Sequence, residues 1–346
     1  MKQHLNSLFV TTQGSYLARE GEAVLVRVER QTKARVPIHM LGSIVCFGRV
    51  GFSPALAGLC GERGVTISLC TEHGRFLARV CGYSPGNVLL RRTQYRWADD
   101  PARSAAVARS VVVGKILNAR QVLMRAVRDY PSAPGAAALE NTAALLGNVV
   151  AAIPPDVGLD ALRGIEGDAA STYFGVFDHL VTGTGEQKSA FAFTSRSRRP
   201  PLDRVNALLS FVYALLAADA RCATEAAGLD AAVGFLHRDR PGRPGLALDL
   251  MEEFRPYLAD RLVLSLVNRR QVDPGGFETT ASGAVTMNDA TRRALLTAWQ
   301  KRKQEVVQHP FIGEKTTVGL LVHLQARLLA RHLRGDLDAY PPFVWK

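Results

Sequence analysis

Apolar and polar residues alternate with a period of two in the first part of the chain. Every second position of 24–28 and of 36–40 is Val, Ile or Met, which predicts strands that bury one face. Turn-forming residues at 13–14, 20–22 and 73–74 separate further short apolar runs. We expect strands at 8–10, 44–47, 65–69 and 76–80, and one short helix at 54–62.

The spacing of apolar residues changes to the 3.6-residue period of helices from about residue 100, in an Ala- and Leu-rich sequence without a fixed-period repeat. The predicted fold class is therefore α+β. A small β-rich N-terminal domain spans 1–86, a linker that begins near Pro85 spans 87–100, and an α-helical catalytic domain spans 101–346. The β-rich domain is short of clustered functional groups, and we interpret it as a packing or dimerisation module. Helices are expected at 102–128, 136–152, 160–181, 203–228, 246–268, 289–307 and 317–333.

The charge balance of the chain indicates the kind of partner that it binds. The 346 residues include 43 Lys and Arg against 31 Asp and Glu, a net charge of +12, which favours a polyanionic partner such as DNA. Basic residues gather before the 203–228 helix and again in the linker, where aromatic residues lie among them. Solvated loops are the alternative interpretation of both clusters. The members are Arg196, Arg198, Arg199 and Arg204, then Arg91, Arg92 and Arg96 with Tyr95 and Trp97.

Cysteines and hydropathy bear on the compartment. The five cysteines have no CxxC spacing and lie in apolar surroundings, which is typical of reduced core residues. The first residues contain no apolar signal-peptide core, and no run of eighteen apolar residues occurs. We expect a cytoplasmic protein without a membrane partner.

Glu166 is the most informative single residue, because it falls on the apolar stripe of a predicted helix. A buried, unpaired carboxylate is costly, so an acidic residue at such a position needs a cation. An ordinary ion pair with an arginine is the alternative. The stripe consists of Leu159, Leu162, Ala169, Ala170, Tyr173, Phe177 and Leu180.

Candidate partners for a metal ion follow downstream. His237 precedes a stretch rich in Pro and Gly, and Asp249 and Glu252 are three residues apart, so a helix would project both from one side. One imidazole and several carboxylates suit a hard or borderline divalent ion with open coordination positions, Mg²⁺ or Mn²⁺. Each residue also has a structural interpretation: a hydrogen-bonded histidine, and acidic residues at a helix N-terminus.

The 203–228 helix carries a polar stripe on an otherwise apolar surface. Asn206, Ser210 and Tyr213 are spaced at i, i+4 and i+7 and must satisfy their hydrogen bonds. The stripe either forms a buried network that fixes helix pairing, or supports Glu166 and His237 around a metal. The sequence contains no GxSxG motif, so a metal acting on a phosphodiester is the chemistry that these residues favour. Hydrolysis by water and attack by a 3′-hydroxyl both remain open.

Several of these segments resemble one family, the CRISPR-associated integrases of spacer acquisition, "Cas-one" in words. The segments are Ile165–Ala170, Arg198–Ser210, Gly234–His237 and Leu248–Pro256. The resemblance covers most of the chain, and 313–325 with Tyr340-Pro-Pro-Phe is similar to the tail of a type I subtype.

The resemblance implies site residues and partners. Glu166, His237 and Glu252 would be the catalytic metal ligands, with Asp249 a supporting carboxylate; many relatives carry Asp at the position of Glu252, which leaves the choice between Glu252 and Glu253 open. Arg198, Arg199 and Tyr213 become candidates for contact with double-stranded DNA or for support of the site. The implied activity is a homodimeric endonuclease and integrase, two dimers of which flank a dimer of a small companion, "Cas-two". The rival hypotheses are a hydrolytic nuclease on branched DNA and a non-enzymatic DNA-binding scaffold.

Overall fold

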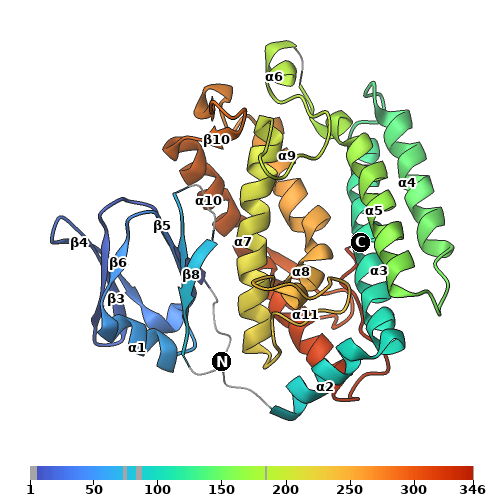
Figure 1. Cartoon of the computed structure of the whole chain (residues 1–346). Coiled ribbons are helices and arrows are strands. Elements are labelled where there is room, and N and C mark those ends of the chain that lie inside the picture. The colour runs from blue at the N-terminus through green and yellow to red at the C-terminus, as the bar shows by residue number, and fades with distance from the viewer. Residues whose placement is uncertain (1–5, 73–75, 83–87, 184, 346) are drawn as a thin grey trace. The chain divides into compact units, whose positions relative to one another are not determined.

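The computed structural model describes residues 6–72, 76–82, 88–183 and 185–345 (Figure 1). The chain divides into two compact units. The first comprises 1–85, 296–305 and 318–320, and the second comprises 86–295, 306–317 and 321–346. Strands dominate the N-terminal region and helices dominate the rest, so the predicted α+β class is confirmed. The predicted turn at 73–74 and the start of the linker at 85–86 lie outside the described residues.

The first unit holds two four-stranded sheets, and their order is β1-β5-β7-β8 and β4-β3-β2-β6. In the first sheet β1, β5 and β7 are parallel and bring Leu8, Ile44 and Ile67 into register, while β8 is antiparallel. Alternate residues of both sheets meet in one apolar core, as the period-two pattern predicts. The elements are β1 (Asn6–Val10), β2 (Tyr16–Glu20), β3 (Ala23–Val28), β4 (Gln31–Pro37), β5 (Leu41–Phe47), β6 (Gly51–Phe52), α1 (Pro54–Glu62), β7 (Thr66–Cys70) and β8 (Phe76–Val80).

The second unit is a helical bundle. Helix α3 packs against α4 and α5, and α7 packs against α8 (Figure 1). The helices from residue 88 onward are α2 (Val88–Asp99), α3 (Pro101–Asp129), α4 (Ala136–Ala151), α5 (Leu159–Gly175), α6 (Gly185–Ala190), α7 (Arg204–Ala226), α8 (Gly245–Glu252), α9 (Arg261–Asn268), α10 (Asp289–Gln304) and α11 (Val318–Leu333). All of them belong to the second unit except 296–304 of α10 and 318–320 of α11, which belong to the first. Two short hairpins join β9 (Phe277–Thr279) to β10 (Val285–Met287) and β11 (Val306–Gln308) to β12 (Lys315–Thr317).

One helix was not predicted, and two predicted helices differ from the structure. The predicted linker 87–100 contains helix α2, which buries only Leu90 and Gln94, too few apolar residues for a periodic signal. The predicted helix at 160–181 ends at Gly175 and continues as the 3-10 turn Phe177–Leu180. The predicted helix at 246–268 is divided into α8 and α9 by a π-helical turn, Arg255–Asp260, because Pro256 has no N–H to continue the α-helical hydrogen bonds.

Helix α7 is the one helix among the described residues that is long and apolar enough to cross a membrane by length and composition. Twelve of its residues, including Leu208, Val212 and Leu216, are buried against the other helices of the unit. Three cysteines, Cys46, Cys60 and Cys70, are buried and unpaired as predicted. Cys81 is exposed, so its assignment to the core was wrong.

Candidate active site

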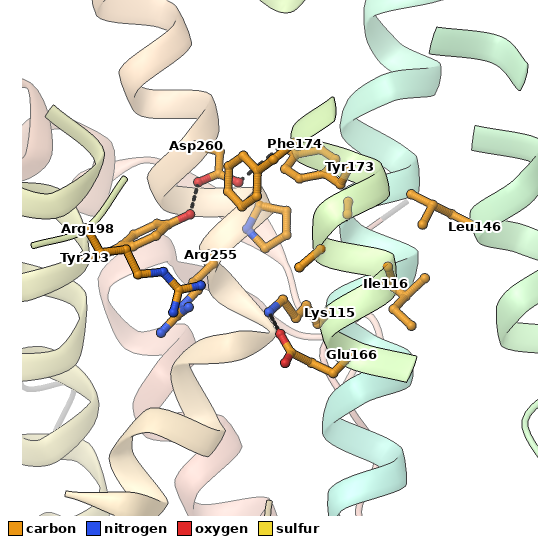
Figure 2. Close-up of a pocket in the computed structure, with 14 residues that line it drawn as sticks. Lys115, Ile116, Leu146, Glu166, Tyr173, Phe174, Arg198, Tyr213, Arg255 and Asp260 are labelled. Atoms are coloured by element: carbon orange, nitrogen blue, oxygen red, sulfur yellow. Dashed lines mark hydrogen bonds and ion pairs between the residues drawn. The ribbon is translucent and has the colours of Figure 1, made fainter. Parts of the chain in front are cut away.

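Glu166 and Glu252 converge on a lysine that the sequence analysis did not single out. Lys115 extends from α3, and its Nζ contacts Glu166 Oε1 on α5 (Figure 2). The same Nζ lies 2.7 Å from Glu252 Oε2 on α8. The Lys115 side chain is 10% exposed and that of Glu252 is 3% exposed. The cation that Glu166 was expected to meet is therefore supplied, in this structure, by a residue 51 positions earlier in the chain.

Charge neutralisation decides the protonation state of Glu252. Burial alone would raise the pKa of this carboxyl group, but the positive charges of Arg255 and Lys115 outweigh burial and hold the pKa below its usual value. Arg255 Nη2 lies 3.1 Å from Glu252 Oε1. Glu252 is thus an anion that lies between the Lys115 ammonium and the Arg255 guanidinium.

His237 is held in place by Asp249. The fully buried Asp249 carboxylate accepts hydrogen bonds from the backbone N–H groups of Phe235 (2.6 Å), Leu236 (3.0 Å) and His237 (3.0 Å). Its Oδ1 also lies 2.6 Å from His237 Nδ1. An imidazole that donates from Nδ1 presents the lone pair of Nε2 to the other side, and Nε2 lies 3.9 Å from Glu252 Oε1. Asp249 is therefore a positioning residue for the imidazole.

The loop that carries His237 needs a glycine at 234. A Cβ on Gly234 would lie 2.7 Å from Asp249 Oδ2 and 2.7 Å from the carbonyl carbon of Gly245, closer than van der Waals contact permits. The other side of the loop is fixed by Arg163 of α5, whose Nε donates to the Leu236 carbonyl at 2.7 Å. The Gly234–His237 segment therefore depends on contacts from both α5 and α8.

Glu252 and its neighbour Glu253 face opposite directions. Glu253 accepts hydrogen bonds from the hydroxyl of Tyr340 (2.5 Å), the backbone N–H of Phe343 (2.6 Å) and Gln325 Nε2 (3.0 Å). Burial raises the pKa of Glu253 to about 8 despite these three donors. Glu253 therefore anchors the C-terminal segment, and Glu252 is the residue of the pair that faces Lys115 and Glu166.

The polar stripe on α7 binds an arginine. Arg196 donates to Asn206 Oδ1 (2.6 Å) and Ser210 Oγ (3.1 Å), and its guanidinium lies 5.3 Å from the ring centre of Tyr213. The Tyr213 hydroxyl donates to Asp260 Oδ1 at 2.6 Å (Figure 2). The stripe thus forms a partly buried network that joins the segment before α7 to the π-helical turn, beside the Glu166 site.

The first predicted basic cluster separates in the structure. Arg196 is taken up by the α7 stripe, and Arg204 donates to the carbonyls of Ala190 and Pro274, so both have structural partners. Arg198 and Arg199 are exposed, and Arg198 lines the pocket beside Lys115 and Glu166 (Figure 2). These two arginines can therefore meet an anionic ligand.

The second predicted cluster lies on helix α2, and its aromatic residues have partners within the protein. The Tyr95 hydroxyl donates to Asp230 Oδ2 at 2.8 Å, and Trp97 packs edge-on against His332 with Arg103 over its ring. The Trp97 ring is therefore engaged within the protein, whereas Tyr95 is 38% exposed, so base stacking at this cluster stays a prediction that rests on Tyr95.

The site opens on a small pocket of about 20 Å³. One wall is apolar and includes Ile116, Leu146 and Phe174. The opposite side is polar and carries Lys115, Arg198, Arg255, Tyr213 and Glu166 (Figure 2). A cavity with three cationic side chains beside a carboxylate cluster is suited to an anionic ligand such as a phosphate group.

The donor set can be tested for its fit to a divalent ion. As the side chains lie, no three His, Cys, Asp or Glu residues in the described part of the chain are close enough together to hold a metal. Lys115 lies between the two carboxylates. Glu252 Oε2 is nevertheless buried and accepts no well-aligned hydrogen bond from the described residues, although the Lys115 ammonium is near. Two carboxylates and an imidazole with a free Nε2 fit Mg²⁺ or Mn²⁺.

Two cationic residues of the site were missed at the sequence level. Lys115 interrupts the buried stretch of α3 and Arg255 lies in the buried turn after α8, so a charged residue within an apolar helical run was the available signal in both cases. Arg255 is three residues after its partner Glu252, so that pair is close in sequence. Lys115 and Glu166 are 51 residues apart. Only tertiary structure brings that pair together.

The fold is that of solved CAS1 proteins. The structure of a CAS1 protein from Thermotoga maritima has a TM-score of 0.80 at 22% identity and covers 96% of this chain and 97% of its own. A casposase bound to integration product has a TM-score of 0.82 at 21% identity, with 99% and 95% covered.

Sequence comparison gives the family. The model of "CRISPR associated protein Cas1" matches residues 8–301. A CRISPR-associated endonuclease Cas1 of Chlorobaculum tepidum is 55% identical and one of Rhodospirillum rubrum is 51% identical, each covered over 100% of both chains. The chain belongs to the Cas1 family of CRISPR-associated endonucleases, and the predicted resemblance is confirmed.

Proposed function

We propose that this protein is a metal-dependent integrase that inserts short foreign DNA into a CRISPR array, by attack of the DNA 3′-hydroxyls on repeat phosphodiesters. One observation carries the proposal. Glu166 and Glu252 meet at a single cation position, with His237 beside Glu252 and with Arg198 and Arg255 lining the adjoining pocket.

The residues of the site have distinct tasks in this chemistry. Glu166, His237 and Glu252 would hold Mg²⁺ or Mn²⁺, which supplies a Lewis acid at the scissile phosphate. Asp249 keeps the His237 imidazole in the tautomer with a free Nε2. Arg255 and Arg198 neutralise the charge of the phosphodiester, and the Tyr213–Asp260 hydrogen bond fixes the wall from which Arg255 projects.

The proposed partners are double-stranded DNA and a small companion protein, Cas2. Solved structures with this fold include a Cas6-RT-Cas1–Cas2 complex, with a TM-score of 0.81 at 20% identity, as well as the casposase with its integration product. The net charge of +12 supports a DNA partner. We further propose that the protein is a homodimer, that two dimers assemble around a Cas2 dimer, and that it acts in the cytoplasm.

A hydrolytic nuclease is the second candidate, because its relatives are named endonucleases and the same site would serve a water nucleophile. Strand transfer separates the two. Labelled duplex with free 3′-hydroxyls is incubated with supercoiled plasmid carrying a repeat, with Mn²⁺, Mg²⁺ or EDTA, and with or without Cas2. Joined product that requires metal is expected. Nicking without joining, even with Cas2, would identify a hydrolytic nuclease instead.

The variant Glu166→Ala tests the site within the same assay. Glu140→Ala is the matched control, since Glu140 is exposed on the neighbouring helix α4. Glu166→Ala should remain folded and lose joined product, whereas Glu140→Ala should retain activity. A Glu166→Ala protein that still joins DNA at the wild-type rate would remove this carboxylate from the mechanism.

Arg198 and Arg199 are the proposed DNA contacts. Filter binding across a salt series should show weaker binding and a shallower salt dependence for the Arg198→Ala/Arg199→Ala variant, because fewer counterions are released. Arg327→Ala/Arg331→Ala is the control, since it removes the same charge from exposed positions on α11. If wild type and the Arg198→Ala/Arg199→Ala variant bind DNA with equal affinity and equal salt dependence, Arg198 and Arg199 are excluded as DNA contacts.

A further inference from the structure

The Lys115 ammonium occupies the position that links the two carboxylates of the site. Nζ contacts Glu166 Oε1 and lies 2.7 Å from Glu252 Oε2. Among the described residues, this is the one cation that pairs with both carboxylates. Lys115 therefore holds α3, α5 and α8 together at the point where the carboxylates would otherwise repel each other.

A divalent ion bound by both carboxylates needs the same space. Carboxylate oxygens bind Mg²⁺ at about 2.1 Å and larger ions at about 2.3–2.6 Å. These distances are no longer than the 2.7 Å between Lys115 Nζ and Glu252 Oε2, so a metal ion bound to both carboxylates would overlap the ammonium. Two cations at one position would also repel each other strongly in a buried site. The ammonium and the metal ion are therefore mutually exclusive at this position.

The surroundings provide a place for the displaced side chain. Lys115 lines the same pocket as Arg198 and Arg255 (Figure 2). Its flexible four-carbon stem gives the ammonium rotatable bonds with which to turn toward these arginines. From the pocket the ammonium would face the same anionic ligand as the two arginines. Displacement by a metal ion thus moves the positive charge of Lys115 away from the two carboxylates and into the pocket, where an anionic ligand would bind.

We propose that Lys115 is an exchangeable internal counter-ion, which holds Glu166 and Glu252 together without metal and is displaced into the neighbouring pocket when a divalent ion binds. This inference rests on the proposed metal dependence. It assigns Lys115 as a positioning residue of the metal-free site, a role distinct from those of the three ligands.

The first test uses the wild-type protein. An amine-acetylating reagent is applied in EDTA and in saturating Mn²⁺, and labelling of each lysine is quantified by mass spectrometry. Labelling of Lys115 should rise at least threefold in Mn²⁺, because its amine leaves a contact that is 10% exposed. Lys188, which lies 2.7 Å from Asp178 Oδ2, is the internal control and should not change. Unchanged or reduced labelling of Lys115 would overturn the proposal.

The second test measures Mn²⁺ affinity by calorimetry. Lys115→Met keeps the length of the side chain and removes the competing charge, so Mn²⁺ should bind at least tenfold more tightly than to wild type. Lys301→Met, which removes a charge at an exposed position, should bind as wild type does. Lys115→Met should also melt lower than wild type in EDTA and regain stability in Mn²⁺.

The outcomes separate this inference from the proposed function. Equal or weaker Mn²⁺ binding by Lys115→Met, with normal binding by wild type, would reject the counter-ion role and leave the metal site intact. Absence of Mn²⁺ binding by both proteins would reject the metal site and the counter-ion role together. If Lys115→Met does not fold, the labelling of wild-type protein decides.

Discussion

Asp249→Asn is the most informative substitution, because it exchanges a single oxygen atom of the α8 side chain that holds the loop carrying His237. The Asp249 carboxylate serves four donors, two on each oxygen: the N–H groups of Phe235 and Leu236 on Oδ2, and the N–H and Nδ1 of His237 on Oδ1. Asparagine replaces one of these oxygens with an NH₂ group. In either orientation of the amide, two donors lose their acceptor.

The expected cost follows from that geometry. A hydrogen bond to a charged group contributes about 1.5–3 kcal/mol, so losing two should lower the free energy of unfolding by about 3–6 kcal/mol. Metal affinity should fall about 10–100-fold, the usual effect of removing the carboxylate that orients a histidine ligand. An amide NH₂ facing Nδ1 would favour the tautomer with hydrogen on Nε2, which cannot bind a metal.

Urea denaturation and Mn²⁺ calorimetry measure the two effects. Asp129→Asn is the control, since the Asp129 side chain is 41% exposed and pairs with Arg125 and Arg128 at the surface, where an ion pair contributes about 0–1 kcal/mol. Asp249→Asn with the stability and the Mn²⁺ affinity of wild type would refute the assignment of Asp249 as the positioning residue.

Three further substitutions test separate contacts around the site, at Glu253, Tyr213 and Gly234. The pKa of Glu253 is raised to about 8 from 4.5, so the folded state keeps its proton longer and the free energy of unfolding should fall by a few kcal/mol as pH rises between these values. Glu253→Gln should flatten this decline in guanidinium titrations at pH 5 and 8; an identical decline in both proteins would contradict it. Tyr213→Phe removes the 2.6 Å hydrogen bond to buried Asp260 and should cost about 1.5–3 kcal/mol in urea, whereas unchanged stability would disprove the contribution of this bond. Gly234→Ala should destabilise by about 1–3 kcal/mol through its clash with Asp249, and a wild-type Tm would show that the clash is absent.

The sequence predicted those helices whose burial follows a simple stripe. Helix α4 was expected at 136–152 and spans Ala136–Ala151, and α11 was expected at 317–333 and spans Val318–Leu333. Helix α2 was missed because its exposed faces are rich in arginine and little of it is buried. The break after α8 was missed because the apolar pattern continues through it without change.

The candidate site was predictable in part. Glu166 stood out as an acid on an apolar stripe, and Asp249 and Glu252 stood out by their spacing. Lys115 could not be paired with them from sequence, since neither local spacing nor periodicity relates α3 to α8. The roles of Asn206 and Ser210 were likewise undecided, because the sequence does not show that Arg196 folds back onto α7.

Helix α8 is held from two sides: its Asp249 accepts hydrogen bonds from the loop that carries His237, and Glu253 at its C-terminal end accepts one from the C-terminal segment. These contacts prevent α8 from rotating about its own axis. A rotation by one residue would place Glu253 where Glu252 now lies. Glu252 is consequently the immobile half of the site. Glu166, whose side chain is 25% exposed, and Lys115 form the adjustable half. Any rearrangement between the metal-free and metal-bound states should then be confined to α3 and α5, with α8 as the fixed frame of reference.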